Sequence, residues 1–418
     1  MSVQPALCPG KWSKSFIKIA LACLFTFVFI ISASGPAQAG YLDDPESIPT
    51  NLPRILSTAC GRCYYVDSQN GDDSRSGRTA QEAWKTLTRL QAEDLKPGST
   101  VLLKRGSEWT GGLVIDESGE KGKPILYTAY GEGEPPVIKN PGEYPSWTKG
   151  VYLYGDWIVL EGLRIQEAHE AGIAILEGAD HNVIRNVEIT DVGIGVWVEG
   201  QYNQIINNHI HDLHIVMSTP GGDDDFGAIG VVLANSYNEV AYNRFQRCIA
   251  PSLDYGVDGG AVEWWSTADY NRVHHNWASE NDGFLEVGGG SAKHAVVAYN
   301  VSHNNGRFSL FNLEGKYRSE VEGFVIEGNT IIETGEADRG FPLFTFWGEP
   351  DETMLVLRDN QVQIERYKDI SNSLAFLLRY ELFPDPQQIN YIIDPARELE
   401  DVLSRAGSDP NKRQLLQP

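Results

Sequence analysis

Several residue types are scarce in this chain. Its 418 residues include only 3 methionines and 5 cysteines, and 34 basic residues stand against 57 acidic ones. The net charge of −23 disfavours nucleic acid and anionic membranes as partners, and a polyanionic substrate would need cations to bridge it. The cysteines are too few for a disulfide-stapled fold or a zinc site, although Cys60 and Cys63 could form one small disulfide.

Long apolar runs are missing after the first forty residues. Lysines precede an apolar run over residues 19–33, and the small-residue motif Ala37-Gln38-Ala39 follows it. This pattern predicts a signal peptide over residues 1–39, with a retained N-terminal anchor as the alternative. We therefore expect a secreted or periplasmic protein that is monomeric and has no membrane association once the signal is removed.

Glycine, proline and aromatic residues are abundant instead. The chain has 42 glycines, 21 prolines, 18 tyrosines and 10 tryptophans. Such a composition is typical of β-rich extracellular proteins and not of long helical bundles.

The dominant pattern after residue 157 is a repeat of short segments that end in asparagine, including HNVIRN, YNQIINN, YNEVAYN and YNRVHHN. A period near 21 to 24 residues, with short strands and no helix, fits one coil of a parallel β-helix. We expect the aligned asparagines to hydrogen-bond to one another from coil to coil. They are Asn208, Asn243, Asn276, Asn300, Asn329 and Asn360. Longer intervals predict inserted loops at residues 211–226 and about 246–257.

Both ends of the repeat carry helical patterns. Thr79-Ala80-Gln81-Glu82 reads as a capping box that opens a helix with Trp84, Leu87 and Leu90 on one face. Residues 394–406 predict a second helix. A solenoid needs such caps, because an open end is an edge prone to aggregation.

The N-terminal half also carries the segments YYVDSQNGDDSRSG, AWKTLTRL, PGSTVLLKRG and KGKPILYTAYGEGEPPVI. With these segments and the asparagine repeats, residues 64–362 resemble the pectate lyase-like right-handed parallel β-helix proteins. The resemblance implies an all-β, right-handed parallel β-helix solenoid that acts on a polysaccharide. That family includes lyases, hydrolases, epimerases and non-catalytic adhesion proteins, so the fold alone fixes no reaction.

The expected organisation has four parts. They are a signal peptide (1–39), a lead-in with a capping helix (40–99), the β-helix (100–362) and a C-terminal cap and tail (363–418).

Two glutamates stand out within the repeat. Strand alternation predicts one outward-facing row of residues, which holds Ala174, Gly195, Gly230, Glu263, Glu286 and Ser309. Glu263 and Glu286 would then lie about 5 Å apart on adjacent coils. Such a pair needs a raised pKa or a cation between its members, and it has the separation expected of a retaining glycosidase. A solvated acidic face neutralised by Arg307 is the alternative.

Further candidates surround this pair. Asp258 and Asp282 precede glycines at matching turns, where they form turns or support catalysis. Three aromatic residues could stack on sugars, and two basic residues could bind substrate: Trp197, Trp265, Phe311, Arg307 and Lys293. Asp223, Asp224 and Asp225 form either a calcium site or a solvated loop, so calcium is the one cofactor that the sequence suggests.

Three functions remain open at this stage. The favoured hypothesis is hydrolysis of a polysaccharide by Glu263 and Glu286, with Asp258 and Asp282 in support. The second is a calcium-assisted lyase of a uronate polymer that uses Arg307 or Lys293 as base. The third is a glycan-binding surface protein without catalysis.

Overall fold

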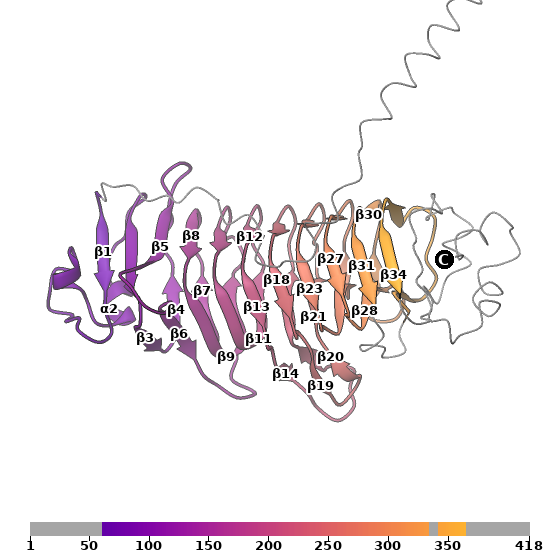
Figure 1. Cartoon of the computed structure of the whole chain (residues 1–418), viewed down its shortest axis with the longest axis horizontal. Coiled ribbons are helices and arrows are strands. Elements are labelled where there is room, and N and C mark those ends of the chain that lie inside the picture. Colours follow the sequence, from indigo (N-terminus) through magenta and orange to yellow (C-terminus); the bar gives the residue numbers. More distant parts are fainter. Residues whose placement is uncertain (1–60, 334–341, 365–418) are drawn as a thin grey trace, which may run out of the picture. The chain divides into compact units, whose positions relative to one another are not determined.

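The computed structural model describes residues 61–333 and 342–364 (Figure 1). These residues all belong to one compact unit, Ile48–Pro418, and the other unit, Met1–Ser47, contains none of them. The predicted signal peptide, Cys60 and the predicted helix at 394–406 lie outside the described residues. Within the described part of the chain, no helix is long and apolar enough to cross a membrane.

One side of every coil belongs to a parallel sheet of eleven strands (Figure 1). In spatial order its strands are β1 (Cys63–Val66), β2 (Thr100–Lys104), β5 (Ile125–Tyr130), β8 (Ile158–Glu161), β10 (Val183–Arg185), β12 (Gln204–Ile206), β17 (Glu239–Ala241), β22 (Arg272–His274), β26 (Val296–Ala298), β30 (Phe324–Glu327) and β33 (Leu355–Arg358). Because this order follows the sequence, each coil stacks on the previous one.

Two further parallel runs complete the coils, and the long strands β9 (Arg164–Ile175) and β11 (Glu188–Val198) take part in both. The first run also contains β3 (Glu108–Thr110), β6 (Val137–Asn140), β13 (His209–His211), β18 (Arg244–Gln246), β23 (Trp277–Ser279), β27 (Val301–His303), β31 (Thr330–Glu333) and β34 (Gln361–Ile364). The second run, which we call the site sheet, also contains β4 (Leu113–Ile115), β7 (Lys149–Leu153), β16 (Ile229–Leu233), β21 (Gly260–Trp264), β24 (Gly283–Val287), β28 (Arg307–Asn312) and β32 (Phe344–Trp347). The fold is therefore the predicted all-β parallel β-helix.

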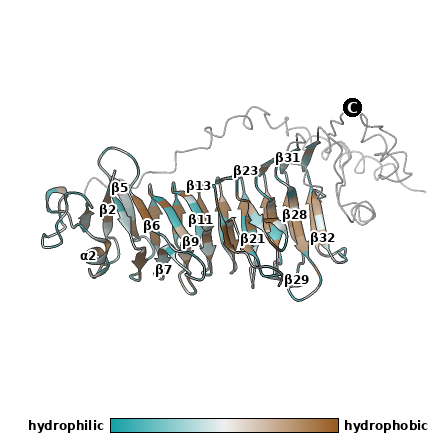
Figure 2. Cartoon of the chain, turned by 90° about the horizontal axis from the view of Figure 1, so that it is seen from below, coloured by the Kyte–Doolittle hydropathy of each residue, from teal (hydrophilic) through white to brown (hydrophobic). Residues whose placement is uncertain are grey.

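The apolar side chains of successive coils form one continuous core. Ile184, Ile205, Val240 and Val273 occupy matching positions on adjacent strands and are all fully buried. In Figure 2 hydrophobic positions run along the strands, whereas hydrophilic ones concentrate in the connecting loops. Each coil buries its apolar residues only against its neighbours, which explains why the sequence repeats.

The predicted asparagine ladder is confirmed. The backbone N–H of Asn208, Asn243, Asn276, Asn300 and Asn329 donates in each case to the side-chain oxygen of the next asparagine, at 2.9 to 3.0 Å. A second ladder joins Asn182, Asn203, Asn238 and Asn271 in the same way. These bonds satisfy buried backbone donors at the corners, where strand pairing ends.

We expect replacement of Asn276 by Ala to destabilise the protein by several kcal/mol. The side chain of Asn276 is 1% exposed, donates to Val240 O and Asn300 Oδ1, and accepts from the backbone and side chain of Asn243. Each buried group left without a partner costs about 1–3 kcal/mol. Urea unfolding would measure the loss, and Gln361→Ala, which removes an exposed amide on β34, is the control. A loss below about 1 kcal/mol for Asn276→Ala would contradict the prediction.

The N-terminal cap differs from the single predicted helix. A 3-10 turn, η3 (Ala80–Glu82), is capped by Thr79 as expected, but the chain is extended at Ala83. A separate helix, α2 (Leu87–Gln91), begins after the cap Thr86. The interruption places the fully buried ring of Trp84 beside the first strand, where residue 84 pairs with Val66. Burial of this large side chain therefore overrides the local helical pattern.

The two predicted insertions form short hairpins beside the site sheet. β14 (Ile215–Met217) pairs with β15 (Phe226–Gly227), and β19 (Ala250–Ser252) pairs with β20 (Gly256–Asp258). Figure 1 shows β14, β19 and β20 projecting below the strands. A third small pair joins β25 (Gly290–Ser291) to β29 (Ser319–Glu320).

Candidate functional site

Glu263 and Glu286 are direct partners in the site sheet. The register pairs β21 with β24 at these two residues, as the sequence predicts. Ala174 of the predicted row is also in register with the pair, whereas Gly195, Gly230 and Ser309 are not. The residues in register with the pair are Ala174, Trp197, Val232 and Leu310.

The error lies in the two glycines, which face the core and do not face outward as predicted. A Cβ added to Gly195 would lie 2.6 Å from Ile210 Cγ2, and one added to Gly230 would lie 2.5 Å from the ring of Phe245. Both neighbours belong to the buried core. The strands turn a corner at this point and direct two successive residues inward. A prediction based on strict alternation therefore assigns the wrong face to every residue before the corner.

A second, smaller cluster of buried apolar residues lies on the same sheet, separate from the main core. It is formed by Ala171, Ile194, Val216, Ile229 and Val232, and three aromatic side chains pack against it: Trp197, Phe226 and Trp265. We call it the outer cluster. Two of the three predicted sugar-stacking residues, Trp197 and Trp265, therefore contact one apolar surface next to the glutamates.

Four carboxyl groups meet beside this cluster. Glu263 is 3% exposed, Asp282 is buried, and Asp258 and Glu286 are partly exposed. Glu263 Oε2 accepts a hydrogen bond of 3.0 Å from the indole Nε1–H of Trp265. Asp258 ends the β19–β20 hairpin, so an inserted loop delivers it to the site.

Arg307 supplies the positive charge of this group. Its Nη2 atom lies 2.9 Å from Asp282 Oδ2 and 3.4 Å from Glu286 Oε2. The register pairs Arg307 with Gly283. A Cβ at Gly283 would lie 3.2 Å from Arg307 Cγ, so the absence of a side chain leaves room for the arginine to reach both acids.

The environment raises the pKa values of three of the acids. Burial, together with the nearby Glu286 carboxylate, raises the pKa of Asp258 to about 7. Burial, Glu286 and Asp258 raise the pKa of Glu263 well above its usual range. Burial also raises the pKa of Glu286, but Arg307 acts in the opposite direction. Neighbouring carboxyl groups in one site thus differ in their tendency to hold a proton, a pattern that is common where acid–base chemistry occurs.

Trp265 borders the acids on one side. Its ring lies over Gly288, where an added Cβ would come 2.5 Å from Cζ2, and it meets Tyr317 edge to face at 6.0 Å. Phe311, in contrast, is fully buried in the core and packs on Phe324 and Phe346. The sugar-stacking prediction for Phe311 is therefore wrong, because its ring fills the inside of the coil.

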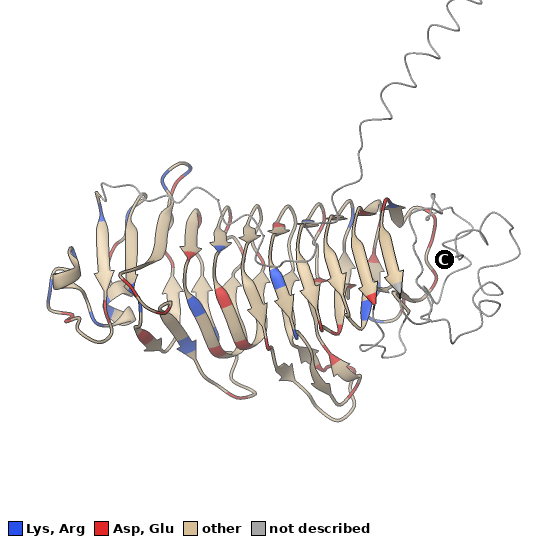
Figure 3. Ribbon diagram, viewed as in Figure 1, with Lys and Arg blue, Asp and Glu red and all other residues tan. Residues whose placement is uncertain are grey.

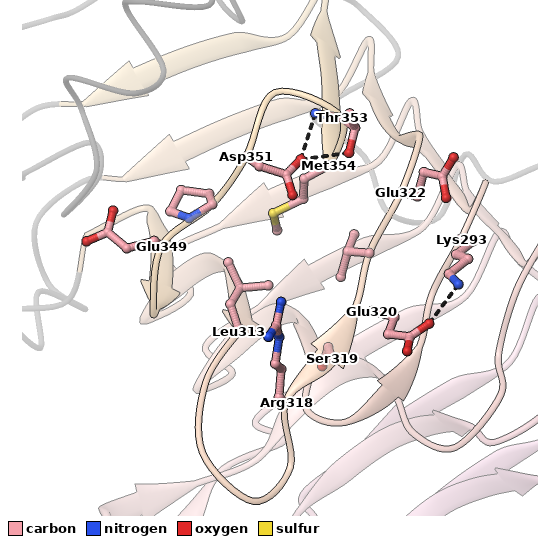
Figure 4. Close-up of a pocket in the computed structure, with 12 residues that line it drawn as sticks. Lys293, Leu313, Arg318, Ser319, Glu320, Glu322, Glu349, Asp351, Thr353 and Met354 are labelled. Carbon is pink, nitrogen blue, oxygen red and sulfur yellow. Dashed lines mark hydrogen bonds and ion pairs between the residues drawn. The ribbon is translucent and has the colours of Figure 1, made fainter.

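Lys293 lies in a different hollow. It lines a cavity of about 220 Å³ together with Arg318, Glu320 and Asp351, and its Nζ lies 2.7 Å from Glu320 Oε2 (Figure 4). None of the four acids of the site lines that cavity. The structure thus does not bring Lys293 to Glu263 and Glu286.

The acidic run Asp223–Asp225 mainly ties the two hairpins together. Asp225 Oδ2 accepts hydrogen bonds from the Ser218 and Ser252 hydroxyls and from the backbone N–H groups of residues 253 and 254. Burial alone would raise the pKa of Asp225, but these donors lower it to about 2. Figure 3 shows acidic positions in these projecting hairpins.

Among residues 61–333 and 342–364, one group of acids has the spacing to hold a metal ion. It comprises Asp224, Asp225 and Asp254, and Asp254 comes from the second hairpin. Asp223 instead accepts a hydrogen bond from the Tyr255 hydroxyl. Since the oxygens of Asp225 already accept five hydrogen bonds, this residue fits a structural role better than a calcium ligand. Calcium at this loop stays a prediction.

Sequence reasoning missed the aromatic residues that extend this surface. Phe226 packs on the outer cluster, and its ring is stacked with that of Trp147 at 6.3 Å and 13°. A tryptophan and a phenylalanine in two glycine- and proline-containing connections were the available signal. Their pairing depends on loop geometry, which the repeat does not encode.

Comparison with known proteins agrees with the fold. Residues 149–338 match the family model described as the right-handed beta helix region. The lacto-N-biosidase of Bifidobacterium longum is 31% identical over 153 residues, which are 35% of this chain and 9% of that enzyme. Pectate lyase L of Paenibacillus polymyxa is 24% identical over 366 residues, which cover 75% of each chain.

Two solved structures share the fold at low identity. A lacto-N-biosidase from Eubacterium ramulus has a TM-score of 0.51 and 17% identity, over 74% of this chain and 65% of the other. A rhamnogalacturonan lyase has a TM-score of 0.52 and 15% identity, over 74% and 84%. The chain has the right-handed parallel β-helix fold, and it is similar to pectate lyase-like proteins. Its relatives include both a glycoside hydrolase and polysaccharide lyases.

Proposed function

We propose that this protein hydrolyses glycosidic bonds of a neutral glycan at the four-carboxyl site. The observation that carries the proposal is the contrast among its acids. Asp258 has a pKa of about 7, whereas Glu286 lies against the Arg307 guanidinium. Glycoside hydrolysis needs one protonated carboxylic acid and one ionised carboxylate on either side of the bond.

Glu286 is the ionised carboxylate in this mechanism. Burial raises the pKa of Glu286, Arg307 opposes this by favouring the charged form, and the side chain is 18% exposed. It acts either on the anomeric carbon or on a water molecule that attacks this carbon. Arg307 and Asp282 hold it in position.

Asp258 is the proton donor. Its raised pKa keeps it largely protonated up to about pH 7, and a general acid is most effective when its pKa lies near the working pH. Glu263, which the sequence-based hypothesis paired with Glu286, is nearly inaccessible and bonded to Trp265. We assign it a positioning role as a neutral carboxyl group that holds the indole against the site.

A neutral substrate agrees with the charges. Four carboxyl groups surround one guanidinium, and the chain carries a net charge of −23, so a uronate polymer would be repelled without added cations. The similarity to the lacto-N-biosidase supports hydrolysis.

The alternative is a lyase, which the similarity to pectate lyase L favours. A lyase needs a free base beside the uronate carboxylate. Arg307 contacts two acids, and Lys293 pairs with Glu320 in another hollow, so neither is well suited to this role.

Product analysis on a panel of neutral and uronate polysaccharides tests the proposal. We expect new reducing ends without an unsaturated, ultraviolet-absorbing product, and the same rate after chelation. An unsaturated product that disappears on chelation would establish the lyase. Binding without turnover across the panel would indicate a glycan-binding protein and also refute hydrolysis.

A further inference from the structure

Trp147 and its aromatic neighbours form an exposed group beside the N-terminal part of the site sheet. Trp147, in the connection between β6 and β7, is 44% exposed although it belongs to an ordered set of rings. It is stacked with Phe226 of the β14–β15 hairpin and meets Tyr144 edge to face at 5.7 Å. Leaving an indole open to water is unfavourable, so an ordered, exposed tryptophan commonly marks a binding surface.

The register places this group in line with the acids. Lys149, Ala171, Ile194, Ile229 and Gly260 are successive partners across β7, β9, β11, β16 and β21. Trp147 and Asp258 each lie two residues before this row. Four strand spacings of about 4.8 Å separate Lys149 from Gly260, which is about 19 Å along the solenoid.

One buried apolar cluster connects the two positions. Phe226, Trp197 and Trp265 all pack on the outer cluster, and the indole of Trp265 donates to Glu263. Trp147 stacks on Phe226 at the far end. Partly buried aromatic side chains thus pack over one buried apolar cluster between Trp147 and the carboxyl groups.

A buried polar atom accompanies the aromatic group. His169 is 8% exposed, and its Nε2 atom has no hydrogen-bond partner among the described residues. Its ring centroid lies 6.5 Å from that of Trp147 and 6.0 Å from that of His214. Burial and His214 lower the pKa of His169 and so favour the neutral ring. The buried Nε2 atom has a hydrogen-bonding capacity that the described residues leave unused, and a small side-chain movement would turn it toward a hydroxyl group.

We propose that Trp147, Phe226 and His169 form a distal sugar-binding subsite, and that the substrate is an extended glycan chain spanning about 19 Å from there to the acids. A pyranose ring presents an apolar C–H face to an indole and hydroxyl groups at its edge, which matches these residues. This inference rests on the proposed hydrolytic function for the position of the reacting bond. The subsite itself requires only that the protein binds a glycan.

Trp147→Ala tests the subsite on a series of oligosaccharides of the cleaved glycan, from disaccharide to octasaccharide. We expect kcat/KM to fall about tenfold for chains long enough to reach residue 147, and to stay unchanged for the shortest, because one stacked ring contributes about a factor of ten. Trp147→Phe should restore most of the loss. Tyr154→Ala is the matched control, since Tyr154 is 53% exposed and follows the other end of β7.

A binding measurement tests the subsite independently of the proposed hydrolysis. Calorimetric titration of the same series into the Glu286→Gln protein and the Glu286→Gln/Trp147→Ala protein should show a length-dependent loss of affinity, whether or not the wild type hydrolyses the glycan. Equal losses at every length, or none, would overturn the subsite. A length-dependent loss in a protein that yields unsaturated products would uphold the subsite and reject only hydrolysis.

Discussion

Replacing Glu286 with Gln is expected to lower kcat by at least about 10²–10⁴-fold, the range seen when a positioned acid or base is removed. The amide keeps the size of the carboxylate but can neither attack the sugar nor take a proton. Initial rates of reducing-end release on the cleaved glycan would measure the loss. KM should change little, because the aromatic residues proposed to bind the sugar remain in place.

The Glu286→Gln result needs a control for the loss of a charge. Glu320→Gln is suitable, since Glu320 also lies within 3.4 Å of a basic group but belongs to the separate Lys293 hollow. That variant should retain wild-type kcat. If Glu286→Gln kept kcat within about threefold of the wild type, Glu286 could not be the reacting carboxylate, because such a change is far below the expected range.

The fold could be predicted because it repeats. The asparagines at 243, 276 and 300 recur at one register, and each bonds the next in the structure. The adjacency of Glu263 and Glu286 followed from the same register. Repetition of a short unit thus fixed both the coil and the partner of each strand residue.

The detailed surface could not be predicted in the same way. Gly195 and Gly230 were predicted to face outward, yet they face the core because the strand bends at a corner. Phe311 looked like a surface aromatic and is buried. Strand alternation assigns faces only along a straight strand, and a coil of a β-helix has corners whose positions depend on side-chain packing.

Contacts between the inserted loops also could not be predicted from the sequence. Asp225 holds the β19–β20 hairpin through Ser252 and residues 253 and 254, and Asp258 lies at the end of that hairpin. The two loops are about thirty residues apart in sequence and share no repeat. The sequence therefore identified Asp258 as a candidate but did not show how the hairpin positions it.

Replacing Asp258 with Asn is expected to lower the activity of the protein and to raise its stability at high pH. Activity should fall by about 10²-fold or more, because the proton donor is lost. The wild-type rate should decline as pH rises through about 7, the pKa of Asp258, and this alkaline limb should be missing from the residual activity of the variant. A pH profile of kcat/KM for both proteins measures this.

The stability of Asp258→Asn should instead rise at high pH. The folded-state pKa of about 7 exceeds the unfolded value near 3.8, so between these pH values the native protein holds a proton that unfolding releases. Wild-type stability therefore falls as pH rises from about 4 to about 7, whereas Asn has no proton to lose. One pKa unit corresponds to about 1.4 kcal/mol, so a gain of a few kcal/mol is expected at pH 8 and almost none at pH 4.

Urea unfolding at both pH values measures the difference, with Glu320→Gln as the control. An equal difference at the two pH values would mean that Asp258 is ionised in the native protein, and it would remove the basis for its role as the acid.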